Sequence, residues 1–304
     1  MIPVPETSFP RQAACSPVPK ITVAMPVFNG GQHLRLSVMS IVGQTFRDWE
    51  LLIIDDGSTD NALQGLADIH DPRIQILRDG NNKGLAARLN EAVDLARGQY
   101  IARMDHDDVS YPERFAHQIA LLESDPNLDV VAVRAVTISD DNKLIGNLPG
   151  PLTHREICAK PWQGFYFPHP TWMGHTTWFR AHRYATPGPH FCEDQELLLR
   201  SHAKSRFATV NQVLFAYRVR NRINWKKQTK TRWTLFNIQL RYFLKSGQFH
   251  FVFLTLAAFV GRIASDLLKV LRQTLVGEQY LRKKVDFADS SKWRDVLKET
   301  LGNA

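Results

Sequence analysis

Short apolar runs alternate with helix-sized segments through the first half of the sequence. The apolar runs are strand-sized, each ends at a polar turn, and they lie at residues 21–27, 49–54, 74–77 and 100–104. Apolar residues at helical spacing fill the intervals at 33–42, 85–96 and 112–122. Buried strands that alternate with helices are typical of a largely parallel sheet. The sequence therefore predicts an α/β domain with a single, mostly parallel, Rossmann-like sheet flanked by helices.

Later segments complete this expected domain. A strand at 130–133 returns to the sheet, and residues 139–164, which hold several Gly and Pro, suit a hairpin and a mobile loop. Two strands, at 204–210 and 213–218, are predicted to close the domain as a pair.

The pattern changes at Trp225. From there apolar residues recur at helical spacing among many Lys and Arg, and a second helix candidate follows Gly247. Its continuous apolar run, residues 251–260, is too short to span a bilayer, which takes about 20 residues. We therefore expect three parts: a flexible lead-in at 1–19, the α/β domain at 20–222 and a helical extension at 223–304.

Two interpretations of the helical extension remain open. A basic, aromatic, amphipathic helix pair with no acidic residue before Asp266 suits the plane of an anionic membrane. Alternatively, the two helices form a hairpin that packs on the α/β domain.

Charge is divided unequally along the chain. Residues 197–265 contain 13 Lys and Arg and no Asp or Glu, so the rest of the chain carries −5 within the net charge of +8. Such a segment points to a polyanionic partner, either nucleic acid or the anionic cytoplasmic leaflet. The basic residues stand among bulky aliphatic residues without a recognisable nucleic-acid-binding module, so we expect a membrane surface and no nucleic acid.

The cysteines and the N-terminus indicate the compartment. Cys15, Cys158 and Cys192 are widely spaced and form no zinc, redox or disulfide pattern, which fits a reducing environment. Residues 1–19 have no apolar core segment and do not form a secretory signal. We expect a cytoplasmic protein, peripheral at the inner or plasma membrane.

The most informative stretch follows the fourth strand. Asp105, Asp107 and Asp108 place three carboxylates within four positions, where they repel one another unless a cation lies between them. Hard oxygen ligands on a short turn suit Mg²⁺ or Mn²⁺, with substrate phosphate completing the coordination. A solvated acidic loop is the alternative.

Polar turns also follow the first three strands, at the edge where an open α/β sheet binds ligands. Phe28 and Asn29 follow the first strand, and Asp55 and Asp56 end the second. The acidic pair either binds a base or ribose or caps the next helix. Lys83 precedes a helix N-terminus, which favours an anion, although a lone Lys there is usually solvated.

Two later segments complete the set of candidates. The aromatic segment 165–173, which includes Trp172, either forms the floor of a sugar site or belongs to the core. Glu193 and Asp194 begin a predicted helix, where they either stabilise the helix dipole or act in catalysis.

These motifs together resemble those of the family 2 inverting glycosyltransferases, which have the A-type nucleotide-sugar-binding fold. The resemblance covers roughly residues 20–220 and rests on four segments in order, 26–29, 55–60, 82–90 and 104–108. It implies that Pro26, Phe28, Asn29, Asp55, Asp56 and Lys83 bind the nucleotide. It also implies that Asp105 serves both the ribose and the metal, and that Asp107 binds the metal.

The resemblance further implies that Asp194 is the catalytic base. Contacts to the acceptor or the diphosphate are expected from Trp172, Glu193, Arg218 and Arg220. We expect Asp56, Asp107 and Asp194 to surround one shared cavity.

The expected reaction moves one sugar from a nucleoside-diphosphate sugar to an acceptor hydroxyl on a glycan or lipid-linked precursor. Processive synthases of this family carry Gln-x-x-Arg-Trp, whereas here Gln228 and Arg232 are one residue too far apart. A nucleic-acid- or membrane-binding scaffold without catalysis is the alternative.

Overall fold

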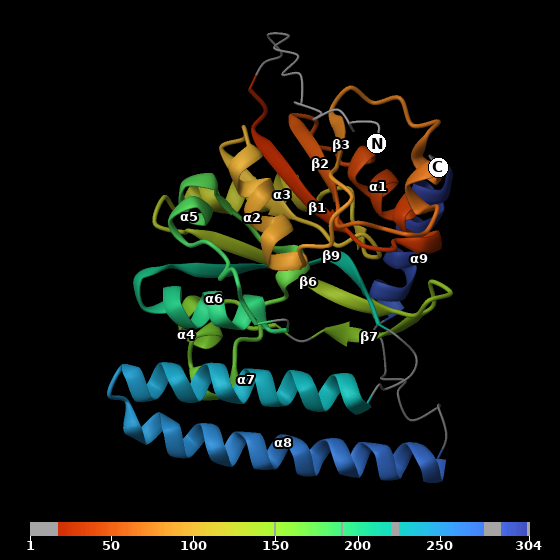
Figure 1. Cartoon of the computed structure of the whole chain (residues 1–304). Helices are drawn as coiled ribbons and strands as arrows, with labels where there is room; N and C mark the ends of the chain where they lie inside the picture. Colours follow the sequence, from red (N-terminus) through yellow and green to blue (C-terminus); the bar gives the residue numbers. More distant parts are fainter. Residues whose placement is uncertain (1–17, 149, 190, 220–224, 277–286, 303–304) are drawn as a thin grey trace, which may run out of the picture.

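The computed structural model describes residues 18–148, 150–189, 191–219, 225–276 and 287–302. Its strands form one sheet in the order β3-β2-β1-β4-β8-β6-β9-β5, with β7 paired to β6 (Figure 1). The strands are β1 (Ile21–Val27), β2 (Trp49–Asp55), β3 (Ile74–Arg78), β4 (Tyr100–Arg103), β5 (Val109–Ser110), β6 (Val130–Ile138), β7 (Leu144–Leu148), β8 (Met173–His175) and β9 (Phe207–Arg218).

The first four strands in the chain, β1 to β4, are parallel to one another, as the sequence predicts. Both faces of the sheet are buried. Strand residues such as Val23 and Met25 pack with one group of helices, and Ala24 and Ile54 pack with another. The predicted fold class is therefore confirmed.

The helices divide between these faces. Side chains of α1 (Leu34–Val42), α3 (Arg114–Ser124) and α9 (Phe287–Gly302) join the core on one face. Side chains of α2 (Leu85–Leu95), α5 (Thr176–Ala181) and α6 (Glu193–Ser201) join the core on the other. The short helix α4 (His154–Ile157) contributes Ile157 to the second core.

The second half of the sheet differs from the prediction in two ways. The expected strand pair at the end of the domain is one long strand, β9, whose register against β6 shifts at Arg134. Asn211 and Gln212 sit within this irregular part and separate the two apolar runs without turning the chain. In addition, β8 is inserted antiparallel between β4 and β6.

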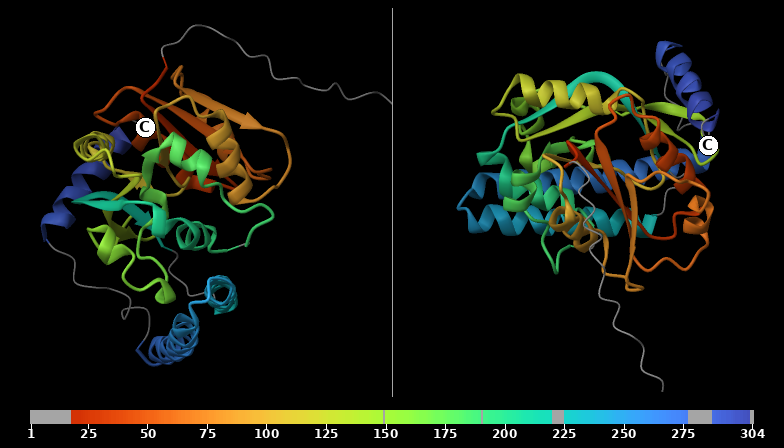
Figure 2. Two further views of the ribbon diagram at one scale, coloured as in Figure 1. Left: turned by 90° about the vertical axis from the view of Figure 1, so that its left-hand side faces the viewer. Right: turned by 90° about the horizontal axis from the view of Figure 1, so that it is seen from above.

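Helices α7 (Trp225–Lys245) and α8 (Phe249–Val276) lie side by side along one end of the molecule (Figures 1 and 2). They pack on the α/β domain. Phe243 is buried, Gln239 Nε2 donates to the Pro161 carbonyl oxygen at 2.7 Å, and the rings of Trp162 and Phe251 stack 5.0 Å apart. The interpretation of α7 and α8 as a hairpin that packs on the α/β domain therefore holds for the side of the two helices that faces the domain.

The outer side of α8 is apolar. Exposed side chains recur at intervals of three, four or seven residues, so they share one side of the helix, which we call the apolar face: Phe249, Phe253, Leu256, Val260, Leu267 and Leu271. Among the described residues, Phe249–Lys269 is long and apolar enough to cross a membrane. The expectation that the apolar segment is too short is therefore wrong, because the helix continues beyond Val260.

Candidate active site

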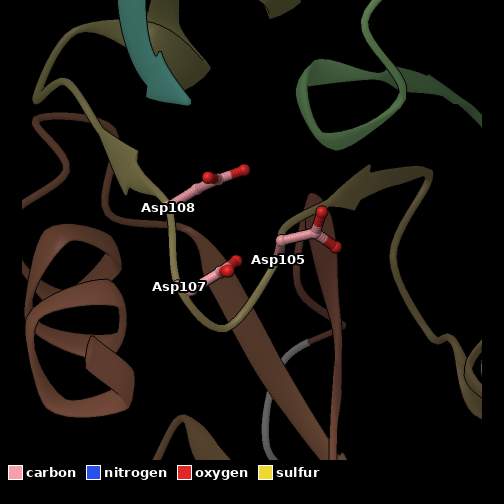
Figure 3. Close-up of side chains that lie close together, drawn as sticks. All are labelled: Asp105, Asp107 and Asp108. Carbon is pink, nitrogen blue, oxygen red and sulfur yellow. The ribbon is translucent and has the colours of Figure 1, made fainter. Parts of the chain in front are cut away.

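Three carboxylates project from the short turn between β4 and β5 (Figure 3). Asp105, Asp107 and Asp108 each offer an oxygen, and these oxygens all lie within 4.8 Å of one another; we call these residues the acidic group. Arg103 Nη2 pairs with Asp105 Oδ1 at 2.7 Å. Asp108 is buried, and its Oδ1 accepts from the Arg218 backbone N–H at 2.7 Å.

The electrostatics of the acidic group favour a cation. Burial, followed by the charges of Asp105 and Asp107, raises the pKa of Asp108 well above its usual range. Burial and the neighbouring Asp105 also raise the pKa of Asp107. Asp108 Oδ2 is buried without a hydrogen-bond partner in the described part of the chain. An unpartnered oxygen among crowded carboxylates fits a divalent metal that prefers oxygen ligands.

Asp108 is the member of this group for which the sequence suggested no separate role. Asp108 follows Asp107 directly in the sequence, but the side chains of adjacent residues in a turn often point in different directions. The backbone contact with Arg218, 110 positions later, is what fixes it in place.

The turns after β1 and β2 are joined to each other. Asn29, in the left-handed region at φ 51°, accepts through Oδ1 from the backbone N–H of Thr59 at 2.8 Å. Asp60 Oδ2 accepts from the Gly31 N–H at 2.8 Å. Asn29 thus braces the two turns, and Phe28, 46% exposed beside it, leaves its ring available for a base.

Asp56 lies in a second structural network. Its carboxylate accepts from the backbone N–H groups of Lys83 at 2.7 Å and Gly84 at 3.0 Å, and from Arg88 Nε at 2.9 Å. These contacts tie the β2 turn to the N-terminus of α2. Asp55 accepts from the Ser58 N–H at 3.0 Å through Oδ1 alone, so Asp55 rather than Asp56 retains an oxygen for a ligand.

A cavity of about 530 Å³ connects the acidic group with the start of α6. Asp105, Glu193 and Asp194 line it together. Pro26 lies in β1, where its carbonyl oxygen is 3.4 Å from His106 Nδ1. Asp56 and Asp107 are not among the lining residues, so the expectation that Asp56, Asp107 and Asp194 surround one cavity is wrong. Asp194 shares the cavity with Asp105, whose carboxylate lies within 4.8 Å of that of Asp107.

The first turn of α6 holds the two acidic residues. Cys192, which precedes the helix, has φ 65°, a left-handed conformation that is uncommon for residues with a side chain. Asp194 Oδ2 accepts from Gln195 Nε2 at 3.0 Å. Glu193 Oε1 lies 3.6 Å from Nδ1 of His169, and burial lowers the pKa of His169 to about 3, so this imidazole is neutral.

Two expected contacts change, and a third stays untested. Trp172 is fully buried, and its Nε1 donates to the Phe167 carbonyl oxygen, so it belongs to the core rather than to a sugar site. The Arg218 guanidinium is buried and donates to the carbonyl oxygens of Asp107 at 2.7 Å and Ser139 at 2.6 Å, so it braces the acidic group. Arg220 lies outside the described residues.

The cavity is also lined by one residue of the predicted aromatic segment and by residues of the extension that the sequence did not identify. Tyr166, from the aromatic segment, is 62% exposed and presents its ring there. Lys227 and Arg232 of α7 and Arg262 of α8 complete the lining. Sequence spacing alone could not place residues of the extension beside Asp194.

Comparisons with known proteins identify the family and the fold. The family described as Glycosyl transferase family 2 matches residues 22–183, more than half of the chain. The chain is 34% identical to the putative glycosyltransferase EpsE of Bacillus subtilis over 170 residues, which cover 54% of this chain and 59% of EpsE. It is 33% identical to the UDP-Glc:alpha-D-GlcNAc-diphosphoundecaprenol beta-1,3-glucosyltransferase WfgD of Escherichia coli over 102 residues, which cover 34% of this chain and 40% of WfgD. The matches thus span about half the length of these relatives.

Solved structures show the same fold. TarS of S. aureus, residues 1–349, in complex with UDP-GlcNAc superposes with a TM-score of 0.61 at 16% identity, covering 93% of this chain and 81% of that chain. At this identity the likeness concerns the fold. The chain therefore belongs to glycosyltransferase family 2 and has the A-type fold.

Proposed function

We propose that the protein is an inverting, metal-dependent transferase that moves one sugar from a nucleoside-diphosphate sugar to an acceptor hydroxyl. The observation that carries this proposal is the shared cavity, which has Asp105 of the acidic group and Asp194 on its lining. With the donor held at the acidic group, Asp194 would take the proton of the acceptor hydroxyl, whose oxygen attacks the anomeric carbon of the donor while the nucleoside diphosphate leaves from the opposite side. Inversion requires such a base and no covalent intermediate.

The acidic group is the proposed metal site. Asp105, Asp107 and Asp108 would hold Mg²⁺ or Mn²⁺, which supplies charge stabilisation for the leaving diphosphate. Phe28 would stack on the nucleotide base, and the second carboxylate oxygen of Asp55 would accept a hydrogen bond from the nucleotide base or the ribose. Lys83 keeps a partly exposed side chain near this edge, paired with Asp79.

Asp194 is the proposed general base. It stands in the first turn of α6 and lines the cavity. The hydrogen bond that its Oδ2 accepts from Gln195 Nε2 orients the side chain, and Oδ1 would accept the proton of the attacking hydroxyl. General-base catalysis of this kind contributes about 10²- to 10⁴-fold. Glu193 is held towards His169 and would position the acceptor.

The acceptor is proposed to be a glycan precursor at the cytoplasmic face of the membrane. The apolar face of α8 is exposed along several turns, and the adjacent helix α7 carries several Lys and Arg residues. Such a helix suits the plane of an anionic bilayer. Because the inner side of α8 packs on the domain, including a hydrogen bond from Arg262 to the Gln163 carbonyl oxygen, we favour a helix that lies on the membrane over one that crosses it. WfgD, by its name, uses a diphosphoundecaprenol-linked acceptor.

A ligand screen tests this function. UDP-, GDP- and dTDP-sugars are added to the full chain with and without Mn²⁺, and the unfolding temperature is measured. We expect one nucleotide to raise it only when Mn²⁺ is also present, because ligand binding to the folded state adds stability. Asp107→Asn is the matched variant, and it should remove the joint effect. If no nucleotide sugar stabilises the chain in the presence of Mn²⁺, the proposed function is wrong.

A further inference from the structure

The side of the active-site cavity that α7 and α8 contribute is basic. Lys227, Arg232 and Arg262 line it, and we call these residues the cationic wall. The acidic partner here is Asp266, which is 2% exposed and whose Oδ2 lies 3.0 Å from Arg232 Nε. The Arg262 Nη2 group donates to the Gln163 carbonyl oxygen. Arg262 Nη1 is buried and has no partner in the part of the chain that the structure describes.

Within the cationic wall, Arg262 therefore keeps a buried donor that has no partner among the described residues. Burial lowers the pKa of Arg262, and the neighbouring Arg232 lowers it further, so the two guanidinium groups repel each other. A guanidinium presents several donors in a planar fork that matches phosphate oxygens. An anion with several oxygens would satisfy the unpartnered donor and reduce the repulsion.

The opposite side of the same helix is apolar. Val260, 59% exposed, belongs to the apolar face and lies two positions before Arg262, which points into the cavity side. On α7, Trp233, 57% exposed, directly follows Arg232. Within one helical turn, therefore, both helices present a cation to the cavity and an apolar side chain to the outside.

This arrangement points to a ligand with an anionic head and an apolar tail. We infer that the cationic wall binds the diphosphate of a lipid-linked acceptor, whose chain then extends along the apolar face of α8. The inference rests on the proposed function, because that function assigns the donor diphosphate to the acidic group and its metal. The acceptor head group would lie across the cavity from Asp105 and beside Asp194. A free phosphate is also an anion, but it has no apolar part that could contact the apolar face.

The first test isolates the cationic wall from the metal site. Inorganic pyrophosphate is titrated into the full chain in EDTA, so that no divalent cation can hold it at the acidic group. We expect one binding site, weakened about tenfold or more in Arg262→Gln, which corresponds to about 1.4 kcal/mol. Lys230→Gln removes an exposed cation of α7 that does not line the cavity and should leave the affinity unchanged. Equal affinities of wild type and Arg262→Gln would overturn the inference.

A second measurement separates the two diphosphates. The nucleotide that stabilises the wild type with Mn²⁺ should stabilise Arg262→Gln equally. If Arg262→Gln loses that stabilisation, the cationic wall serves the donor, and the acceptor assignment is wrong. If the wild type shows no stabilisation by nucleotide and Mn²⁺, the proposed function fails, while the pyrophosphate titration still reports on the wall.

The third measurement identifies the lipid. Sedimentation is measured with vesicles of phosphatidylcholine and phosphatidylglycerol, with or without a polyprenyl diphosphate. The polyprenyl diphosphate should increase the bound fraction of wild type and of Lys230→Gln but not of Arg262→Gln. The same increase in Arg262→Gln would show that the polyprenyl diphosphate binds without the cationic wall, and no increase in wild type would show that only the phospholipid head groups attract the protein. Either result would overturn the inference.

Discussion

Replacing Asp108 by Asn should change stability in opposite directions with and without ligand. At 4.8 Å and an effective dielectric constant of about 20, two unit charges repel by about 3 kcal/mol. Asp108 faces two such neighbours, and proton uptake and the nearby Arg103 and Arg218 offset part of this repulsion. We therefore expect Asp108→Asn to gain about 1–2 kcal/mol of unfolding free energy without metal. Asn keeps the acceptor that the Arg218 backbone N–H requires.

The same substitution should weaken the metal site. Nucleotide and Mn²⁺ at about 100 times their dissociation constant stabilise a protein by about 2.7 kcal/mol. Asp108→Asn should lose most of this gain because the buried, unpartnered Oδ2 is gone. The variant would then be more stable than wild type in EDTA and less stable with both ligands.

Differential scanning calorimetry at neutral pH measures both states. Each kcal/mol corresponds to a shift of about 2–4 °C in the unfolding temperature for a domain of this size. Ser124→Ala, on the exposed end of α3, serves as a control for handling and concentration. A variant that is destabilised in EDTA and still gains the full stabilisation from nucleotide and Mn²⁺ would refute the reasoning about the acidic group.

Three further results are expected. Asp194→Asn should lower kcat by about 10²- to 10⁴-fold with little change in unfolding temperature. The control variant Glu196→Gln, which replaces an acidic residue of the same helix that is paired with an arginine, should keep kcat within about twofold. Equal losses of kcat in both variants would exclude Asp194 as the base. Burial lowers the pKa of His169 to about 3, so below about pH 6.5 the unfolded chain binds one more proton than the folded chain. The unfolding free energy should therefore decrease as the pH is lowered from 6.5 to about 3, by up to about 1.4 kcal/mol per pH unit. Urea titrations should show a smaller slope in His169→Gln. Phe253→Ser should reduce binding to anionic vesicles about tenfold without changing the unfolding temperature, because the ring is 74% exposed. The control variant Leu95→Ser on α2 should leave vesicle binding unchanged. Unchanged vesicle binding in Phe253→Ser would mean that the apolar face does not contact the bilayer.

The sequence predicted the first half of the fold well because its strands are continuous apolar runs that end at polar turns. Burial on both faces of a parallel sheet produces this pattern, and the same burial fixes which turns share an edge. It failed at β9 because Asn211 and Gln212 interrupt the apolar pattern, which resembles a turn, although the chain continues as one irregular strand.

The candidate site was predicted in part, for a related reason. The motif residues at the strand ends lie at the predicted edge of the sheet. The sequence did not show which of these side chains form structural hydrogen bonds or belong to the core. Asp56 and Arg218 are occupied by Arg88, backbone N–H groups and carbonyl oxygens, and Trp172 is in the core. The cationic wall was missed because it depends on how α7 and α8 pack beside α6, and helical periodicity does not specify a docking position.

The most direct test of the account is a calorimetric titration of the nucleoside diphosphate with and without Mn²⁺, in wild type and in Asp107→Asn. The account predicts tight binding to wild type only with Mn²⁺ and a loss of at least about tenfold, or about 1.4 kcal/mol, in Asp107→Asn. Binding of equal affinity in EDTA, or in Asp107→Asn with Mn²⁺, would contradict the claim that the acidic group holds the donor through a metal.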